Sequence, residues 1–302
     1  MKEFWSYSRF KKIPLEYRLT LGEGQTPFRF IDIDGLKVGI KDENQNPNGS
    51  FKDRSLAYQV SYHIFKGKRE FAISSSGNAA ISAASYCSLA RVKLDIFVSN
   101  NIKPEKLSKL ESLCSKDVIL HKSLKPRSDL IKFIAESGAT DIRGSKDDSA
   151  ILGFETIAYE IIDQYPQIDS LFLPCSSGTS ALGIINGFKR LKKKIKVYIC
   201  QTAKVSQMAS AFDKDFVKAS TSYADAITDR VASRKKEVVS AVKGTDGGGF
   251  VVNDALLYQA NDYAVKCNLY YSYNSLLGLA GLLKAITKLK NFKYPVVLAS
   301  GL

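Results

Sequence analysis

Residues 41–54 read KDENQNPNGSFKDR, and this stretch joins a predicted strand to a predicted helix. The apolar run 37–41 precedes it, and a helix-like pattern covers 50–65. Asn46, Pro47 and Gly49 favour a turn between the two elements. The stretch therefore places Lys52 near the first turn of a helix, directly after a polar loop.

The same strand–loop–helix order recurs in two more stretches, SSSGNAA at 74–80 and PCSSGTSALG at 174–183. A fourth loop of small residues, ASGL at 299–302, follows the last predicted strand. The glycine cluster 244–249, GTDGGG, is interpreted as a further loop.

Strand-like and helix-like runs alternate along most of the chain. The predicted strands are 37–41, 70–74, 94–98, 118–120, 170–174, 197–201 and 295–299, and the predicted helices are 50–65, 79–90, 103–112, 151–164 and 182–193. This alternation predicts an α/β fold with parallel sheets built from βαβ units. Ligands of such sheets bind beyond the carboxyl ends of the strands, so the loops above are the candidate sites.

Two of these loops carry residues with useful chemistry. Residues 176–180, SSGTS, would offer backbone N–H groups, hydroxyls and a helix N-terminus to a phosphate. Lys52 lies beside a second helix N-terminus, which favours loss of its proton, and a neutral amine attacks aldehydes. Each feature by itself also has an ordinary explanation: residues 176–180 could simply cap a helix, and Lys52 could be an exposed lysine.

Composition indicates a globular protein of 302 residues with 45% hydrophobic residues and a formal net charge of +14. Apolar runs are too short to span a membrane, and residues 1–12 lack the apolar core of a signal peptide, so we expect a cytoplasmic protein. The densest basic run, KRLKKKIK at 189–196, is interpreted as a solvated helix end rather than a nucleic-acid site.

The cysteines and histidines do not suggest a metal centre. Five cysteines form no C-x-x-C pair and their number is odd, which favours free buried thiols over disulfides or zinc. Only two histidines are present, and His63 lies in a helix-like run where packing is the expected role.

Four stretches together resemble the threonine synthase-like family of pyridoxal-phosphate-dependent enzymes, which have the tryptophan synthase beta-like fold (fold type II). They are LGEGQTP at 21–27, KDENQNPNGSFKDR at 41–54, SSGNAA at 75–80 and NSLLGLAGLLK at 274–284. They occur in the family's order over nearly the whole chain, with Asn48 in place of the usual threonine.

The resemblance implies a role for each matching residue. Lys52 would hold pyridoxal 5'-phosphate as a Schiff base and later move the substrate's α-proton, and Asn78 would bind the phenolic oxygen of the cofactor. The cofactor's phosphate would lie on Ser176, Ser177, Gly178, Thr179 and Ser180, and Ser300 would face its ring nitrogen. Ser75, Ser76, Gly77 and Arg54 would bind the substrate.

The resemblance also implies two α/β domains with the active site between them. We expect a large cofactor-binding domain of residues 1–57 and 147–302, and a smaller mobile domain of residues 58–146. A homodimer is the expected assembly, with a small amino acid as substrate and neither nucleic acid nor membrane as partner.

The chain departs from the family where threonine synthases bind the phosphate of O-phosphohomoserine. Ala150 and Glu155 stand where the family's R-x-EGQKT segment has arginine and lysine. We expect a lyase, threonine synthase-like in the first place, that forms threonine and phosphate. Serine/threonine dehydratase or cysteine synthase-like chemistry stays open, as does a regulatory protein that binds the cofactor or an amino acid without turnover.

Overall fold

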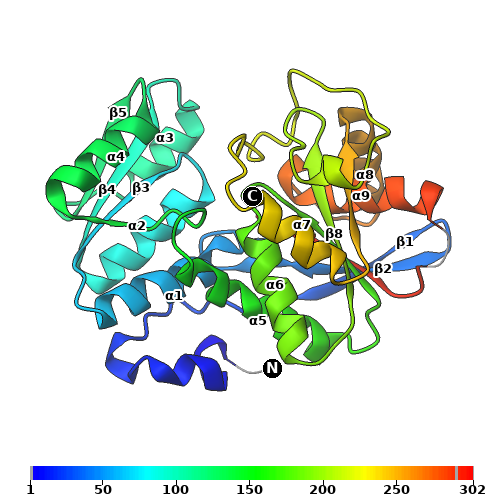
Figure 1. The fold of residues 1–302 in the computed structure, drawn as a ribbon, viewed down its shortest axis with the longest axis horizontal. Helices are drawn as coiled ribbons and strands as arrows, with labels where there is room; N and C mark the ends of the chain where they lie inside the picture. Colours follow the sequence, from blue (N-terminus) through cyan, green and yellow to red (C-terminus); the bar gives the residue numbers. More distant parts are fainter. Residues whose placement is uncertain (1–2, 290–291, 302) are drawn as a thin grey trace. The chain divides into compact units, whose positions relative to one another are not determined.

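The computed structural model describes residues 3–289 and 292–301, which form two compact units (Figure 1). The first unit comprises Gln25–Gln45 and the chain from Phe154 onward, and the second comprises the segment up to Gly24 together with Asn46–Gly153. Each unit contains its own parallel or mostly parallel sheet. The α/β class predicted from the alternation of strands and helices is confirmed.

The first unit is built on a six-stranded sheet in the order β1-β2-β10-β7-β8-β9. Only β1 is antiparallel to its neighbour; the other neighbouring strands run parallel. The strands are β1 (Phe28–Ile33), β2 (Leu36–Asp42), β7 (Ser170–Pro174), β8 (Lys196–Thr202), β9 (Gly248–Val252) and β10 (Pro295–Ala299).

Helices cover both faces of this sheet. α8 (Asp254–Lys266) and α9 (Tyr273–Lys288) pack on one face, where Leu257 and Leu276 join Phe172 and Phe250 of the sheet in one hydrophobic cluster. The opposite face carries α6 (Thr179–Arg190) and α7 (Lys235–Lys243), as Figure 1 shows. A sheet buried on both faces explains why its strands read as nearly continuous apolar runs.

The second unit contains a four-stranded parallel sheet in the order β5-β4-β3-β6. Its strands are β3 (Glu70–Ser74), β4 (Lys93–Ser99), β5 (Val118–Ser123) and β6 (Thr140–Asp141), and its helices are α1 (Lys52–Phe65), α2 (Asn78–Ala90), α3 (Pro104–Glu111) and α4 (Pro126–Ser137). α1 and α2 pack on one face, where Leu56 and Ala84 meet Phe71 and Leu94. α4 packs on the other face through Leu130.

Every strand and helix predicted from the apolar pattern is present, with ends shifted by a few residues. The predicted helix 151–164 corresponds to α5 (Ser149–Gln164), which crosses the division between the units. The interpretation of 244–249 as a loop is wrong at its end, because Gly248 and Gly249 begin β9. A Cβ on Gly247 would lie 2.0 Å from the carbonyl oxygen of Val197, so close backbone approach requires glycine there.

The two compact units do not coincide with the expected domains. Residues 46–57 and the segment up to Gly24 belong to the second unit, whereas the expected small domain covers 58–146. Compactness does not report motion, so closure of a mobile domain stays a prediction.

All five cysteines are free, as predicted; Cys87, Cys175 and Cys200 are buried, while Cys114 is exposed and Cys267 is partly buried. Among the described helices, none combines the length and the apolar character that crossing a membrane requires.

Candidate active site

The loop before Lys52 is fixed by a network of hydrogen bonds. Asp53 accepts hydrogen bonds from the backbone N–H and the side-chain amide of Asn48, at 2.7 and 2.8 Å. The amide oxygen of Asn48 accepts a further bond from Ser85 on α2, at 2.8 Å. The asparagine that replaces the family's threonine therefore ties this loop to α2.

Lys52 is the first residue of α1, as the sequence predicted. Gly49 in the preceding turn has a φ of 80°, a left-handed conformation that favours glycine. Burial lowers the pKa of Lys52 from 10.5 to about 8, because an ammonium loses hydration when protein atoms surround it. Its ammonium also lies 4.9 Å from the centre of the Phe51 ring. A larger share of Lys52 is therefore neutral at pH 7 than of a lysine with the ordinary pKa.

The loop predicted to bind substrate follows β3 in the same unit. Ser75 accepts a hydrogen bond from the backbone N–H of Gly77 at 3.3 Å, and Asn78 is the first residue of α2. Ser75, Ser76, Gly77 and Asn78 thus lie at the carboxyl end of a parallel strand, where ligands of α/β sheets bind. Arg54 is fully buried within α1, and its predicted role in substrate binding stays untested.

The predicted phosphate loop lies in the first unit, between β7 and α6. Gly178 has a φ of 86° and caps α6, whose twelve residues begin at Thr179. The Ser177 and Thr179 hydroxyls lie 3.0 Å apart, and Ser176 accepts hydrogen bonds at 3.3 Å from the backbone N–H groups of Thr228 and Asp229. Backbone N–H groups at a helix N-terminus favour an anionic guest, so the loop suits a phosphate.

Ser300 follows β10 at the same edge of this sheet. β10 lies between β2 and β7, and all three strands run parallel. The carboxyl ends of parallel strands lie at one edge, so Ser300 and the loop 176–180 share that edge. Asn44, two residues beyond the end of β2, also lies there, although the sequence did not single it out.

Glu155 does not project a free carboxylate, despite replacing a lysine of the family pattern. It is fully buried in α5, where the Tyr159 hydroxyl donates to it at 2.8 Å and the Arg190 guanidinium at 3.0 Å. Gly187 of α6 packs directly against its backbone, since a Cβ there would lie 2.7 Å from the carbonyl oxygen of Glu155. Glu155 therefore helps to join α5 to α6.

Sequence reasoning missed a buried ion pair within the first unit. The Lys41 ammonium lies 2.7 Å from Glu160, and both side chains are fully buried. The same ammonium donates to the carbonyl of Thr26 at 2.8 Å and to the side chain of Gln164 at 2.9 Å. The sequence offered only a weak signal, because β2, LKVGIKD, also contains Lys37 and Asp42, and nothing local shows that Lys41 is the buried lysine that needs an anionic partner.

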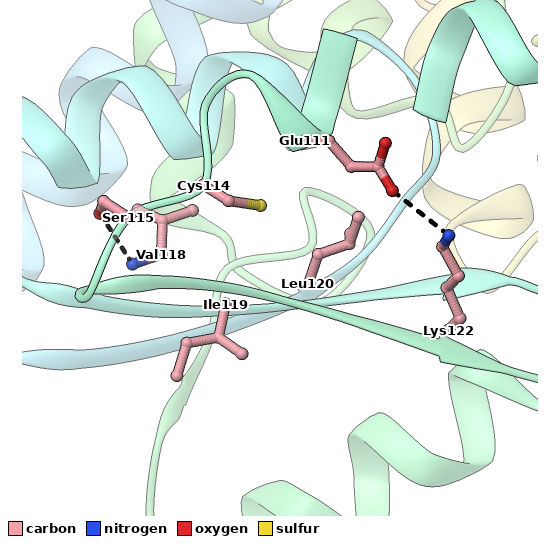
Figure 2. A pocket seen from close by; sticks show the side chains of 7 residues that line it. All are labelled: Glu111, Cys114, Ser115, Val118, Ile119, Leu120 and Lys122. Carbon is pink, nitrogen blue, oxygen red and sulfur yellow. Dashed lines mark hydrogen bonds and ion pairs between the residues drawn. The ribbon is translucent and has the colours of Figure 1, made fainter. Parts of the chain in front are cut away.

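A separate groove of about 530 Å³ lies in the second unit, beside the edge strand β5. Figure 2 shows Glu111 and Lys122 across it, and their charged groups are 3.3 Å apart. None of the predicted cofactor or substrate residues lines this groove.

Curated relatives of the chain include threonine synthases and L-serine dehydratases. A threonine synthase from Halalkalibacterium halodurans is 29% identical over 184 residues, which cover 58% of this chain and 51% of the relative. An L-serine dehydratase from Saccharomyces cerevisiae is 29% identical over 220 residues, covering 65% and 62%. The chain thus spans about half the length of the threonine synthase that it matches.

Solved structures of low sequence identity share the fold. Maize serine racemase superposes with a TM-score of 0.79 at 20% identity, covering 92% of this chain and 88% of that one. The processed form of threonine deaminase isoform 2 from Solanum lycopersicum gives a TM-score of 0.76 at 22% identity, covering 91% and 78%. The predicted tryptophan synthase beta-like fold is therefore confirmed.

A family model described as "Pyridoxal-phosphate dependent enzyme" matches residues 19–301. The residues present fit this cofactor, because Lys52 offers an amine of lowered pKa to an aldehyde and the start of α6 offers N–H groups to a phosphate. The match covers far more than half of the sequence, and so the chain belongs to the family of pyridoxal-phosphate-dependent enzymes and has pyridoxal 5'-phosphate as its cofactor.

Proposed function

We propose that this protein is a lyase in which the ε-amine of Lys52 binds pyridoxal 5'-phosphate covalently and acts on a small amino acid. The observation that carries the proposal is the amine itself: it lies at the start of α1, after a left-handed glycine turn, and its pKa is lowered to about 8. An ordinary surface lysine is almost wholly protonated at neutral pH and reacts poorly with aldehydes.

Other residues of the chain bind the remaining groups of the cofactor and the substrate. The N–H groups and hydroxyls of residues 176–180 bind the phosphate, Asn78 binds the phenolic oxygen, and Ser300 lies at the ring nitrogen. Ser75, Ser76 and Gly77 bind the carboxylate of the substrate, and Arg54 is a further substrate-binding residue. When bound, the cofactor delocalises the negative charge left at the α-carbon after proton loss. Once the substrate's amine has replaced Lys52 on the cofactor, the freed ε-nitrogen of Lys52 would accept the α-proton and return it.

O-phosphohomoserine is the first substrate candidate, with threonine and phosphate as products. The names of the curated relatives support it, since several are threonine synthases. The basic net charge of +14 would also attract a phosphorylated substrate.

Elimination from serine or threonine is the second candidate, and one observation favours it. Ala150 and Glu155 supply no cation at the family's phosphate-binding segment, and Arg190 already engages the Glu155 carboxylate. A substrate with a neutral hydroxyl needs no such cation. The resemblance to L-serine dehydratase over 220 residues supports the same choice.

Two measurements test the proposal. Protein supplied with pyridoxal 5'-phosphate should show an absorbance band at about 410–420 nm that is lost in Lys52→Ala. A panel of amino acids, followed by mass spectrometry, then separates the candidates: threonine and phosphate from O-phosphohomoserine indicate the synthase, and keto acids from serine or threonine indicate the dehydratase. A colourless protein would refute both, and spectral changes without product would indicate a regulatory binding protein.

A homodimer and a cytoplasmic location belong to the same proposal. Size-exclusion chromatography with light scattering tests the first, and fractionation of cells tests the second.

A further inference from the structure

Four polar groups from distant parts of the chain form a hydrogen-bonded chain beside Ser300. Ser272 donates its hydroxyl proton to the carbonyl oxygen of Gly301 at 2.8 Å, and the N–H of Gly301 donates to the Ser275 hydroxyl at 2.9 Å. The Ser275 hydroxyl in turn lies 2.9 Å from the side-chain oxygen of Asn44. Ser272 is the N-cap of α9 and Ser275 lies in its first turn, whereas Asn44 follows β2.

The direction of donation along this chain fixes the role of Asn44. Ser275 has one hydroxyl proton and two acceptors in reach, Asn44 and, at 2.6 Å, the carbonyl of Gly301. That carbonyl also accepts the proton of Ser272, since a carbonyl oxygen has two lone pairs. Because the side-chain oxygen of Asn44 faces Ser275, the amide nitrogen of Asn44 is the donor left over.

This final donor is buried and has no partner within the residues that the structure describes. Asn44 is only 7% exposed, and its amide nitrogen makes no hydrogen bond. A buried donor left without an acceptor costs about 1–3 kcal/mol, so native structures rarely retain one without a reason. The unmet donor indicates that a ligand supplies the acceptor.

The position of Asn44 in the sheet indicates which part of the ligand accepts the hydrogen bond. β2 and β10 pair with Asp42 opposite Ala299, so Asn44 and Ser300 follow the ends of neighbouring parallel strands. The hydrogen-bonded chain also holds Gly301, the residue after Ser300. We propose that the amide nitrogen of Asn44 donates a hydrogen bond to the ring nitrogen of the bound cofactor, and that Ser275 positions Asn44 and, through Gly301, the segment that carries Ser300.

The inference rests on the proposed cofactor site and adds a consequence to it. Asn44 and Ser300 are both uncharged, and neither gives up a proton at neutral pH. A neutral donor and a neutral neighbour favour a ring nitrogen that keeps its lone pair. An acidic residue at the same place would favour a protonated ring instead.

The test uses pyridoxine 5'-phosphate, which has no aldehyde and therefore binds without a bond to Lys52. Its affinity for the apoprotein is compared by calorimetry with that of the analogue in which C–H replaces the ring nitrogen. Wild-type protein should prefer pyridoxine 5'-phosphate. Asn44→Ala should weaken its binding about three- to tenfold and leave the binding of the C–H analogue unchanged, as expected for one lost hydrogen bond.

Asn44→Asp is the sharper variant, since it keeps the size of the side chain and its acceptor for Ser275 but replaces the donor by an oxygen. A carboxylate beside the ring nitrogen favours the protonated ring, so in Asn44→Asp the binding of pyridoxine 5'-phosphate should tighten as the pH falls, more steeply than in the wild type. The same pH dependence in the variant and in the wild type would overturn the proposal. Equal losses for both ligands in Asn44→Ala would also overturn it.

Ser275→Ala tests the positioning role and should reduce the preference between the two ligands. Ser170→Ala is the matched control, because Ser170 is also buried in this unit but lies at the other end of the sheet, where it bonds Asp169. The ratio of the two affinities is taken on one sample, so a loss of folded protein cancels. If the wild-type protein binds neither compound, the proposed cofactor site is refuted. If Lys52 only fails to bond the cofactor, the affinities of these two ligands still test the role of Asn44, because neither ligand bonds to Lys52.

Discussion

The lowered pKa of Lys52 predicts how its reactivity changes with pH in the apoprotein. Burial places the pKa at about 8 instead of 10.5. At pH 7 about a tenth of the Lys52 amines are therefore neutral, against about 0.03% for a lysine of ordinary pKa, a difference of about 300-fold. Its rate of acylation should rise about tenfold per pH unit below pH 7 and level off above pH 8.

Competitive labelling with trace acetic anhydride measures this profile, with each lysine followed by peptide mass spectrometry. Lys93 is an internal reference in the same unit, because its hydrogen bond to Glu70 raises its pKa above 10.5. Its labelling should still be rising at pH 10. If acetic anhydride reaches Lys52 slowly, the maximal labelling rate falls, but the pH at which labelling is half-maximal does not change. A Lys52 midpoint as high as that of Lys93 would refute the reasoning.

The same shift fixes the sign of a stability effect. The unfolded chain binds a proton at Lys52 up to about pH 10.5, whereas the folded chain releases it near pH 8. The free energy of unfolding should therefore rise with pH between these values through this group. Lys52→Met should remove that part of the rise in urea titrations.

Three further changes test the framework around the site. Lys41→Met should lower the free energy of unfolding by about 3–5 kcal/mol in urea denaturation, because it leaves Glu160 buried without its cation; a loss below 1 kcal/mol would contradict the importance of this pair. Arg190→Ala should cost less, about 1–3 kcal/mol, since Arg190 is half-exposed, and adding Glu155→Gln should recover part of the loss; no recovery would argue against their interaction. Gly178→Ala forces a φ of 86° on a residue with a Cβ, which would also lie 2.3 Å from Val238, so it should lower the melting temperature and weaken the binding of pyridoxine 5'-phosphate at least tenfold; unchanged affinity of the folded variant would exclude the loop as the phosphate site.

The apolar pattern was sufficient to predict the strands that carry the site. β3, β7 and β10 are short buried runs followed by small polar residues, so the loops after them could be found without a structure. The turn-forming residues before Lys52 placed it near a helix start, whereas its role as the cofactor lysine was implied only by the family resemblance of residues 41–54. The strands and the polar loops after them depend on neighbouring residues in the sequence, so they can be predicted without a structure.

Features that depend on distant contacts were not predictable. Asn44 and Ser275 are 231 residues apart, and nothing local marks either as part of a hydrogen-bonded chain. β9 was missed because its glycines were taken as turn formers, whereas they permit close packing against β8 and the residues around Ala209. The ion pair between Glu155 and Arg190 could not be predicted either, because Arg190 lies 35 residues away on the next helix, α6.

The central claim is the bond between Lys52 and the cofactor, and chemical trapping tests it most directly. Protein supplied with pyridoxal 5'-phosphate is reduced with borohydride, digested and mapped by mass spectrometry. We predict a phosphopyridoxyl group on the peptide that contains Lys52, at near-stoichiometric yield, with only traces on other lysines. A modified lysine elsewhere, or a Lys52 peptide without the label, would contradict the assignment.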